Sequence, residues 1–115
     1  MNISFTETSP AHLDQTKQML NELRLQIHRG GYSCLCVGIP RFKQDVRQLL
    51  SKDLYPYIAS HIGNITPEAV DQAIREAIQH AWKHRAPAVW EKYFPGSVKA
   101  PSNKLFIATL AEHLK

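Results

Sequence analysis

The side chains with the clearest chemical potential lie on one face of a predicted helix that begins at Pro67 and extends to about His84. On this face Gln72 can donate to and accept from adenine, and Asp71 can accept from the amine of cytosine. The spacing of Asp71 and Arg75 equally fits an ion pair on a solvated helix face. If this face reads DNA, the contact residues are Thr66, Glu68, Ala69, Asp71, Gln72, Arg75, Gln79, Lys83 and Lys52.

Other cations near this segment can bind phosphate groups, which position a protein without reading sequence. They are Arg41, Lys43, Arg47 and Lys52 before the predicted helix, and Lys83, His84 and Arg85 at its end. Scattered cations of this kind also occur on many solvated surfaces. The acidic residues Glu68, Asp71 and Glu76 are expected to cluster on the polar face, where they weaken attraction to DNA phosphates.

Metal binding and catalysis find little support. His80 and His84 have a spacing found in zinc sites, but no glutamate follows His80 and no third ligand is indicated, so we expect no metal and no cofactor. Cys34 and Cys36 point to different sides of a predicted helix, and we expect reduced thiols in and beside the core. The sequence shows no glycine-rich phosphate loop and no nucleophile elbow, so we expect no enzyme activity.

The residues around the polar face have the spacing of a helix-turn-helix. Asp53 is expected to cap a helix with Pro56 in its first turn and Gly63 at its end. Thr66 then favours an N-cap and Pro67 a first helical residue. The apolar positions at helical spacing are Leu54, Ile58, Ala59 and Ile62 in the first helix, and Val70, Ala73, Ile74, Ala77, Ile78, Ala81 and Trp82 in the second.

Further helical stretches flank this unit. The first starts at Ser9-Pro10 and is expected to end at Gly30-Gly31. Pro40 is expected to end or kink the second. A third amphipathic stretch is predicted to carry Phe42, Val46, Leu49 and Leu50.

Downstream, Pro87 opens a short helix that Pro95-Gly96 closes, and Ser102 caps the last helix. Aromatic residues of this region and of the preceding helix can stack on single strands or pack in the core, and we favour the core. They are Trp82, Trp90, Tyr93 and Phe94. No β-hairpin signal is present. We therefore predict an all-α protein, a compact bundle of about six helices, with residues 1–10 as an extension and residues 11–115 as one domain.

Bulk properties agree with a small globular domain. The chain has 115 residues, 43% of them hydrophobic, and a formal charge of +4, which suits a polyanionic partner without establishing one. The uncharged stretch from Gly30 to Pro40 is far shorter than the roughly 20 apolar residues of a membrane span, so we expect no membrane partner. The polar N-terminus lacks a secretory signal, and we expect a cytoplasmic location.

A specific combination of residues is distributed over most of the chain. Its members are Gly31-Tyr32, Leu35, Leu54-Tyr55-Pro56, Ile58-Ala59, Thr66, Val70, Ala73-Ile74-Arg75, Ala77-Ile78, Ala81-Trp82, Pro101-Ser102-Asn103 and Phe106-Ile107-Ala108. Through them the sequence resembles the C-terminal DNA-binding effector domain of the sporulation response regulator, the stage-zero sporulation protein A family. The resemblance implies that the helix at Leu54 braces the helix at Pro67, which enters the DNA major groove. It also implies a homodimer on DNA through the last helix and contact with a sigma subunit of RNA polymerase.

Three departures from the family pattern affect these expectations. The family domain follows a phosphoacceptor receiver domain, whereas thirty residues precede Gly31 here, so we expect no control by phosphorylation in cis. Where the family presents arginine, glutamate and arginine to base edges, this chain has Ala69, Asp71 and Gln72, so we expect a different preferred DNA site. The histidine after the matched arginine is Glu76 here, which removes a possible phosphate contact.

Two functions follow from these observations. We favour a sequence-specific, double-stranded DNA-binding transcriptional regulator whose helix from Pro67 enters the major groove. The alternative is a protein-interaction module that keeps the fold, has lost DNA reading and binds a regulator or a sigma subunit. The loss of two family arginines and the acidic residues on the polar face motivate the alternative.

Overall fold

The computed structural model describes residues 9–115, which form helices joined by short connections and contain no strand. In chain order the helices are α2 (Pro10–Glu22), α3 (Gly30–Gln44), η1 (Leu50–Leu54), α4 (Tyr55–Ile62), α5 (Pro67–Lys83), α6 (Pro87–Tyr93) and α7 (Asn103–Glu112). The element η1 is a single π-helical turn that runs directly into α4. The prediction of an all-α bundle of about six helices is confirmed.

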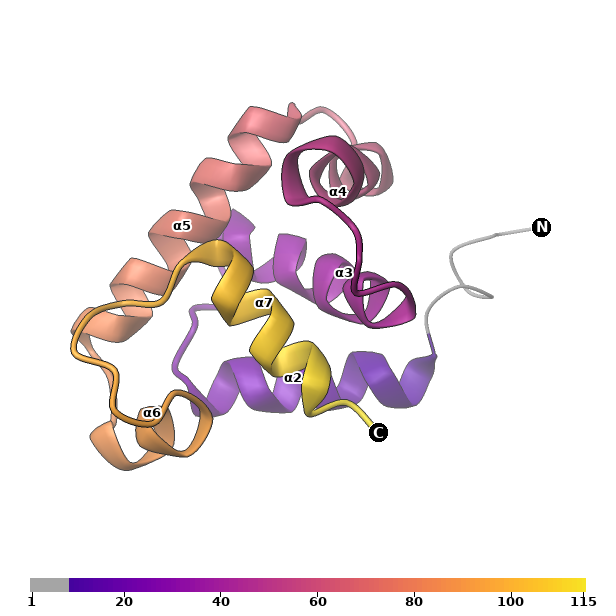
Figure 1. Ribbon diagram of the computed structural model, residues 1–115. Coiled ribbons are helices and arrows are strands. Elements are labelled where there is room, and N and C mark those ends of the chain that lie inside the picture. The colour runs from indigo at the N-terminus through magenta and orange to yellow at the C-terminus, as the bar shows by residue number, and fades with distance from the viewer. Residues whose placement is uncertain (1–8) are drawn as a thin grey trace.

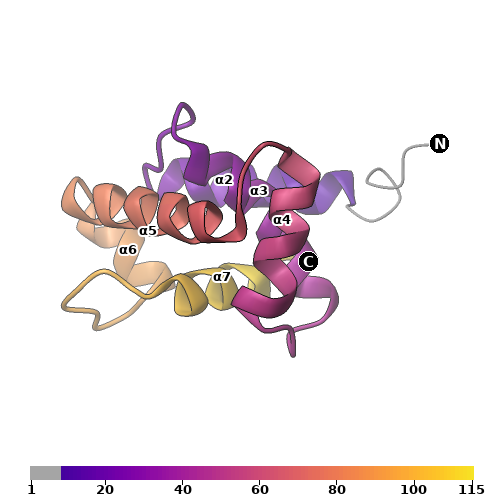
Figure 2. The same ribbon diagram turned by 90° about the horizontal axis from the view of Figure 1, so that it is seen from above.

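Helix α3 occupies the centre of the bundle. It packs against α2, α4, α5 and α7, and in Figure 1 it lies between α2 below and α4 above. Seen from above in Figure 2, α5 and α7 run along the same side of the molecule and α4 crosses near their ends. The arrangement leaves one long side of α5 without a covering helix. Within residues 9–115, no helix combines the length and apolar character that crossing a membrane requires.

Three helix starts follow the predicted capping chemistry. The Ser9, Thr66 and Ser102 hydroxyls accept hydrogen bonds from the backbone amides of His12, Ala69 and Leu105. These bonds satisfy amide groups that have no partner inside the helix. The predicted first residues Pro10, Pro67 and Pro87 also begin their helices.

The prediction that Gly30-Gly31 ends the first helix is wrong, because α2 ends at Glu22 and both glycines begin α3. Leu23 and Leu25 are both buried, whereas Ile27 is 62% exposed. Arg24, at φ 66°, turns the chain between the two buried leucines. The helix therefore stops where core burial requires a turn.

Of the two predicted effects of Pro40, an end of the second helix is wrong, and so is the amphipathic stretch predicted to begin at Phe42. Helix α3 continues through Pro40 to Gln44 and includes the buried Phe42. Burial of Pro40 and its neighbours offsets the backbone hydrogen bond that proline cannot donate. The third amphipathic stretch is absent from residues 45–49, where Val46 and Leu49 are 59% and 52% exposed.

Asp53 does not cap α4. Helical backbone already starts at Leu50, so Asp53 lies within η1, and its carboxylate accepts a hydrogen bond from the Leu49 amide at 2.8 Å. The Asp53 side chain thus provides a partner for the backbone amide of the residue that immediately precedes the π-helical turn. Leu54, Ile58 and Ala59 are buried as predicted, but Ile62 is 40% exposed.

The aromatic residues of the C-terminal half belong to the core. Trp90, Tyr93 and Phe94 are buried, and the Phe94 ring stacks on Phe106 at 5.6 Å between centroids. Trp82 is half-buried and meets Trp90 edge-on. The predicted core role is confirmed, and it leaves little aromatic surface for stacking bases.

Cys34 and Cys36 are both buried and unpaired with each other. Burial raises the pKa of each thiol to about 11. Thiolates are therefore scarce at neutral pH, which fits inert thiols of the core and its boundary rather than metal ligands.

Replacing Gly31 tests the close contact between α3 and α5. A Cβ at residue 31 would collide with the backbone carbonyl of Ala73 and lie 2.6 Å from the Cβ of Ala77. We expect Gly31→Ala to lower the free energy of unfolding by about 1–3 kcal/mol, measured by urea denaturation. Gly30→Ala is the matched control, because nothing lies within 4 Å of its added Cβ. Equal stability of the two variants would contradict the contact.

Candidate nucleic-acid interface

Helices α4 and α5 are joined by residues 63–66 in a tight turn. Gly63 and Asn64 have φ values of 84° and 57°, in the left-handed region that suits glycine and asparagine. Helix α5 buries Val70, Ile74 and Ala77 together with Ile78 and Ala81, and α4 packs against it. This geometry fits a helix-turn-helix in which α4 braces α5.

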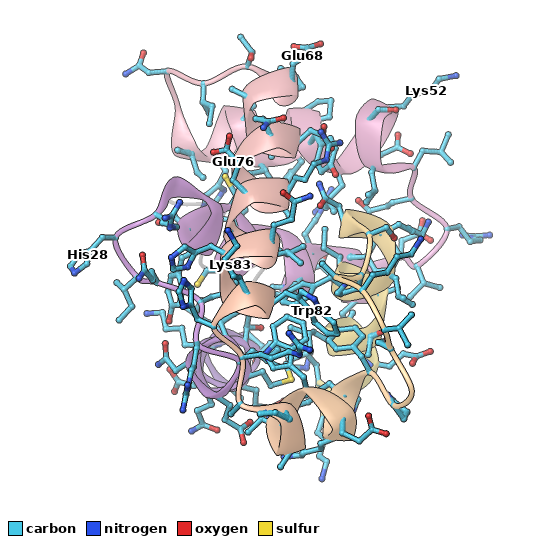
Figure 3. All side chains as sticks on the ribbon, turned by 90° about the vertical axis from the view of Figure 1, so that its left-hand side faces the viewer. His28, Lys52, Glu68, Glu76, Trp82 and Lys83 are labelled. Atoms are coloured by element: carbon cyan, nitrogen blue, oxygen red, sulfur yellow. The ribbon has the colours of Figure 1, made fainter. Side chains whose placement is uncertain are left out.

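The side of α5 opposite its buried residues is open to solvent. Figure 3 looks at this side and shows Glu68, Glu76 and Lys83 spaced along it. The predicted contact residues that are exposed are Thr66, Glu68, Ala69, Gln72, Arg75, Gln79 and Lys83, with Lys52 exposed on η1. Asp71 is the exception, because it is half-buried. The structure therefore brings the α5 residues onto one surface and places Lys52 beside it.

Hydrogen bonds within α5 link the polar groups on this surface. The Arg75 guanidinium donates to the Asp71 carboxylate at 2.7 Å and to the Gln72 amide oxygen at 3.2 Å. The Gln72 amide nitrogen donates to Glu76 at 2.8 Å. The Asp71–Arg75 ion pair predicted from the spacing is confirmed. Exposed pairs of this kind contribute at most about 1 kcal/mol each, so a ligand can replace them at low cost.

Asp71 is also tied to the rest of the bundle. The side-chain amide of Asn103, at the start of α7, donates to the Asp71 carboxylate at 3.1 Å, to the Asp71 carbonyl at 3.1 Å and to the Tyr55 hydroxyl at 3.0 Å. Asn103 is 8% exposed and Tyr55 is 4% exposed. Burial raises the pKa of Tyr55 to about 12, so the phenol stays protonated at neutral pH. The network joins α4, α5 and α7 and holds the carboxylate that binds Arg75.

The positioning roles of Tyr55 and Asn103 were not foreseen from the sequence. Both residues belong to the combination that carries the family resemblance, and this was the available signal. Asn103 is separated in the chain from Tyr55 by 48 positions and from Asp71 by 32 positions. Helical periodicity contains no information about hydrogen bonds over such separations. With Asp71 bonded on both oxygens, Gln72 is the more exposed of the two predicted base-reading side chains.

A groove of about 660 Å³ runs along one flank of α5. Asp71, Arg75 and Gln79 form one wall, and Leu49 to Lys52 of the η1 region form another. Residues 99–104 complete it, adding Lys99 and Lys104, which the sequence analysis did not single out.

The other predicted phosphate-binding residues are dispersed. Arg41 lies over the Tyr57 ring at 4.2 Å, Arg47 pairs with Asp45 at 3.2 Å, and Arg85 lies over the Trp82 ring at 3.8 Å. Lys52 borders both the α5 groove and a smaller polar groove that contains Arg41 and Arg47. Of Arg41, Lys43, Arg47 and Lys52, Lys52 is therefore the one that lines the groove beside α5.

The His80 and His84 rings contact each other at a tilt of 45°, with centroids 4.6 Å apart. Partial desolvation lowers the pKa of His80, and the positive charges of Arg29, His84 and Lys83 lower it further. In the part of the chain that the structure describes, no three or more metal-binding side chains converge. The lowered pKa favours the neutral form of His80, close to the cations of a solvated helix end.

Comparison with known protein families identifies a match over most of the chain. A family model described as sporulation initiation factor Spo0A C terminal covers residues 16–114. The matched region includes most of α2 and all of α3 to α7. It therefore contains the α4–α5 unit, the Asn103 network and the groove.

Removing the Asn103 amide tests the network. Asn103→Ala leaves the buried Tyr55 hydroxyl and the Asp71 carbonyl without their donor, and we expect the free energy of unfolding to fall by about 1–3 kcal/mol. Gln72→Ala, on the exposed side of α5, is the control, with an expected change within about 0.5 kcal/mol. Thermal and urea unfolding followed by circular dichroism measure both variants. An Asn103→Ala protein as stable as Gln72→Ala would show that the network contributes nothing.

Proposed function

The chain belongs to the family of sporulation initiation factor Spo0A C-terminal domains, and from that premise we propose that it is a transcriptional regulator that binds specific double-stranded DNA sequences. Members of this family are DNA-binding effector domains of a regulator rather than enzymes. The observation that carries this proposal is the open polar side of α5, capped by Thr66 and braced by α4. A helix held in this way can enter the major groove with its N-terminal half against the base edges.

The exposed residues of α5 suggest how the bases are read. Gln72 has an amide that pairs well with the N6 and N7 positions of adenine. Its present partners, Arg75 and Glu76, lie on the same exposed side and can be exchanged for DNA groups. Lys83 near the C-terminal end of α5 and Lys52 beside it can bind phosphates.

The acidic residues on this side limit nonspecific attraction. Glu68 and Glu76 are exposed, so they repel phosphates that approach them. Asp71 is neutralised by Arg75 at 2.7 Å. We infer that the protein depends more on base contacts and flanking cations than on the charge of α5 itself.

Selection of bound sequences from a random duplex pool tests the proposal. We expect a defined consensus, relaxed at one base position by Gln72→Ala, because one good pairing contributes about 1–3 kcal/mol of discrimination. Arg75→Ala should weaken binding to all sequences alike and flatten the salt dependence. Gln18→Ala, exposed on α2, is the matched control. Failure of the wild-type protein to bind any duplex at about 50 mM salt would overturn the proposal.

We further propose that two copies pair on DNA through α7 and that the domain contacts a sigma subunit. Support for pairing comes from Leu105, which is 49% exposed on α7 beside the half-buried Ala108 and Thr109. An exposed leucine on a helix can pack against its copy in a twofold interface.

Substitution of Leu105 tests the pairing. We expect Leu105→Lys to abolish cooperative binding to a duplex with two selected sites while leaving single-site affinity within about threefold, because a buried charge opposes the interface. Gel-shift titration measures both constants, and Val98→Lys, at a position 92% exposed on a loop, is the control. Unchanged cooperativity would place the interface elsewhere.

A further inference from the structure

The groove beside α5 gathers positive charge from separate parts of the chain. Lys52 comes from η1, Arg75 from α5, Lys99 from the connection before α7 and Lys104 from the first turn of α7. Among the described residues that line the groove, Asp71 is the one carboxylate, and Arg75 neutralises it. The groove therefore presents a net excess of cations around about 660 Å³ of open space.

We propose that this groove binds one sugar-phosphate strand of the DNA duplex, with Lys99 and Lys104 as phosphate-binding residues. This proposal rests on the proposed function, because it specifies which of the two flanks of α5 the neighbouring DNA strand follows. A row of cations along an open groove suits a polyanionic chain, since phosphates recur at regular spacing along each strand.

The distribution of acids selects this flank. The stripe of α5 that faces the groove is Asp71, Arg75 and Gln79. Glu68 and Glu76 do not line the groove, and Figure 3 shows Glu76 on the opposite side of α5 from Lys52. A strand in the groove avoids the carboxylate of Glu76, whereas a strand over the other side of α5 meets it. Glu68 lies beyond one end of the groove, where it lines a smaller pocket together with Ser51 and Asp71.

Two of the groove cations are held in place. The Lys104 ammonium lies over the Phe42 ring, 5.3 Å from its centroid, and Arg75 is bound to Asp71, which Asn103 anchors. Lys104 also stands in the first turn of α7, where backbone amides add positive potential. Restrained cations lose less conformational entropy on binding than free ones.

The test removes the two new cations together. We expect the double variant Lys99→Gln with Lys104→Gln to bind every duplex more weakly by the same factor and to keep the selected consensus. The slope of log K against log salt concentration should become shallower by about 1.8, or about 0.9 per lost contact. The control pair, Lys17→Gln with Lys92→Gln, makes the same change of charge on α2 and α6. The control should leave that slope nearly unchanged.

Several outcomes separate this proposal from the proposed function. A wild-type protein that binds no duplex overturns both proposals. A wild-type protein that binds, with equal slopes for the two double variants, overturns the groove assignment alone. Equal competition by a glutamate-rich peptide of the same charge would also overturn it, because the groove would then be a general anion surface. The single variant Lys99→Gln, which leaves the contact over Phe42 intact, should show about half of the slope change.

Discussion

The architecture depends on the close approach of α3 and α5. Gly31 has no side chain, and this allows the start of α3 to lie directly against the backbone of Ala73 and the methyl group of Ala77. Small residues on both helices let the two backbones come near each other, as ridges-into-grooves packing requires. Because α3 also contacts α2, α4 and α7, it fixes α5 relative to the whole bundle. The exposed side of α5 is thus a rigid surface rather than a hinged element.

A buried polar network adds orientation to this packing. Tyr55, Asn103 and Asp71 join three helices, and Asp71 carries the outer pair with Arg75. Buried polar groups stabilise a fold when all of them find partners, and no buried side-chain nitrogen or oxygen of the described residues lacks one. The network therefore connects core packing directly to the charged edge of the functional surface.

The functional surface combines acids and cations in separate places. Exposed glutamates lie on the outer side of α5, and the lysines lie on η1, on the 99–104 segment and at the end of the helix. Membership of the family supports a DNA-binding domain. In the proposed function, phosphate contacts from neighbouring elements would position α5, and the residues on α5 would determine which sequence is preferred.

Local chemistry in the sequence determined much of the fold. Hydroxyl caps set the starts of α2, α5 and α7, with a proline as first residue of α2 and α5. Helical periodicity identified the buried side of α5, because these effects act within one or two turns. The same periodicity predicted the Asp71–Arg75 pair. It also placed the candidate reading residues on one side of the helix.

Tertiary structure decided the features that depend on distant partners. Core burial extended α3 through Pro40 and ended α2 at Glu22, and a π-helical turn that starts at Leu50 places Asp53 inside η1. The Asn103 network and the lysines at 99 and 104 came beside α5 through contacts between segments far apart in the chain. Such contacts are selected by the total free energy of packing, which no local pattern of residues encodes.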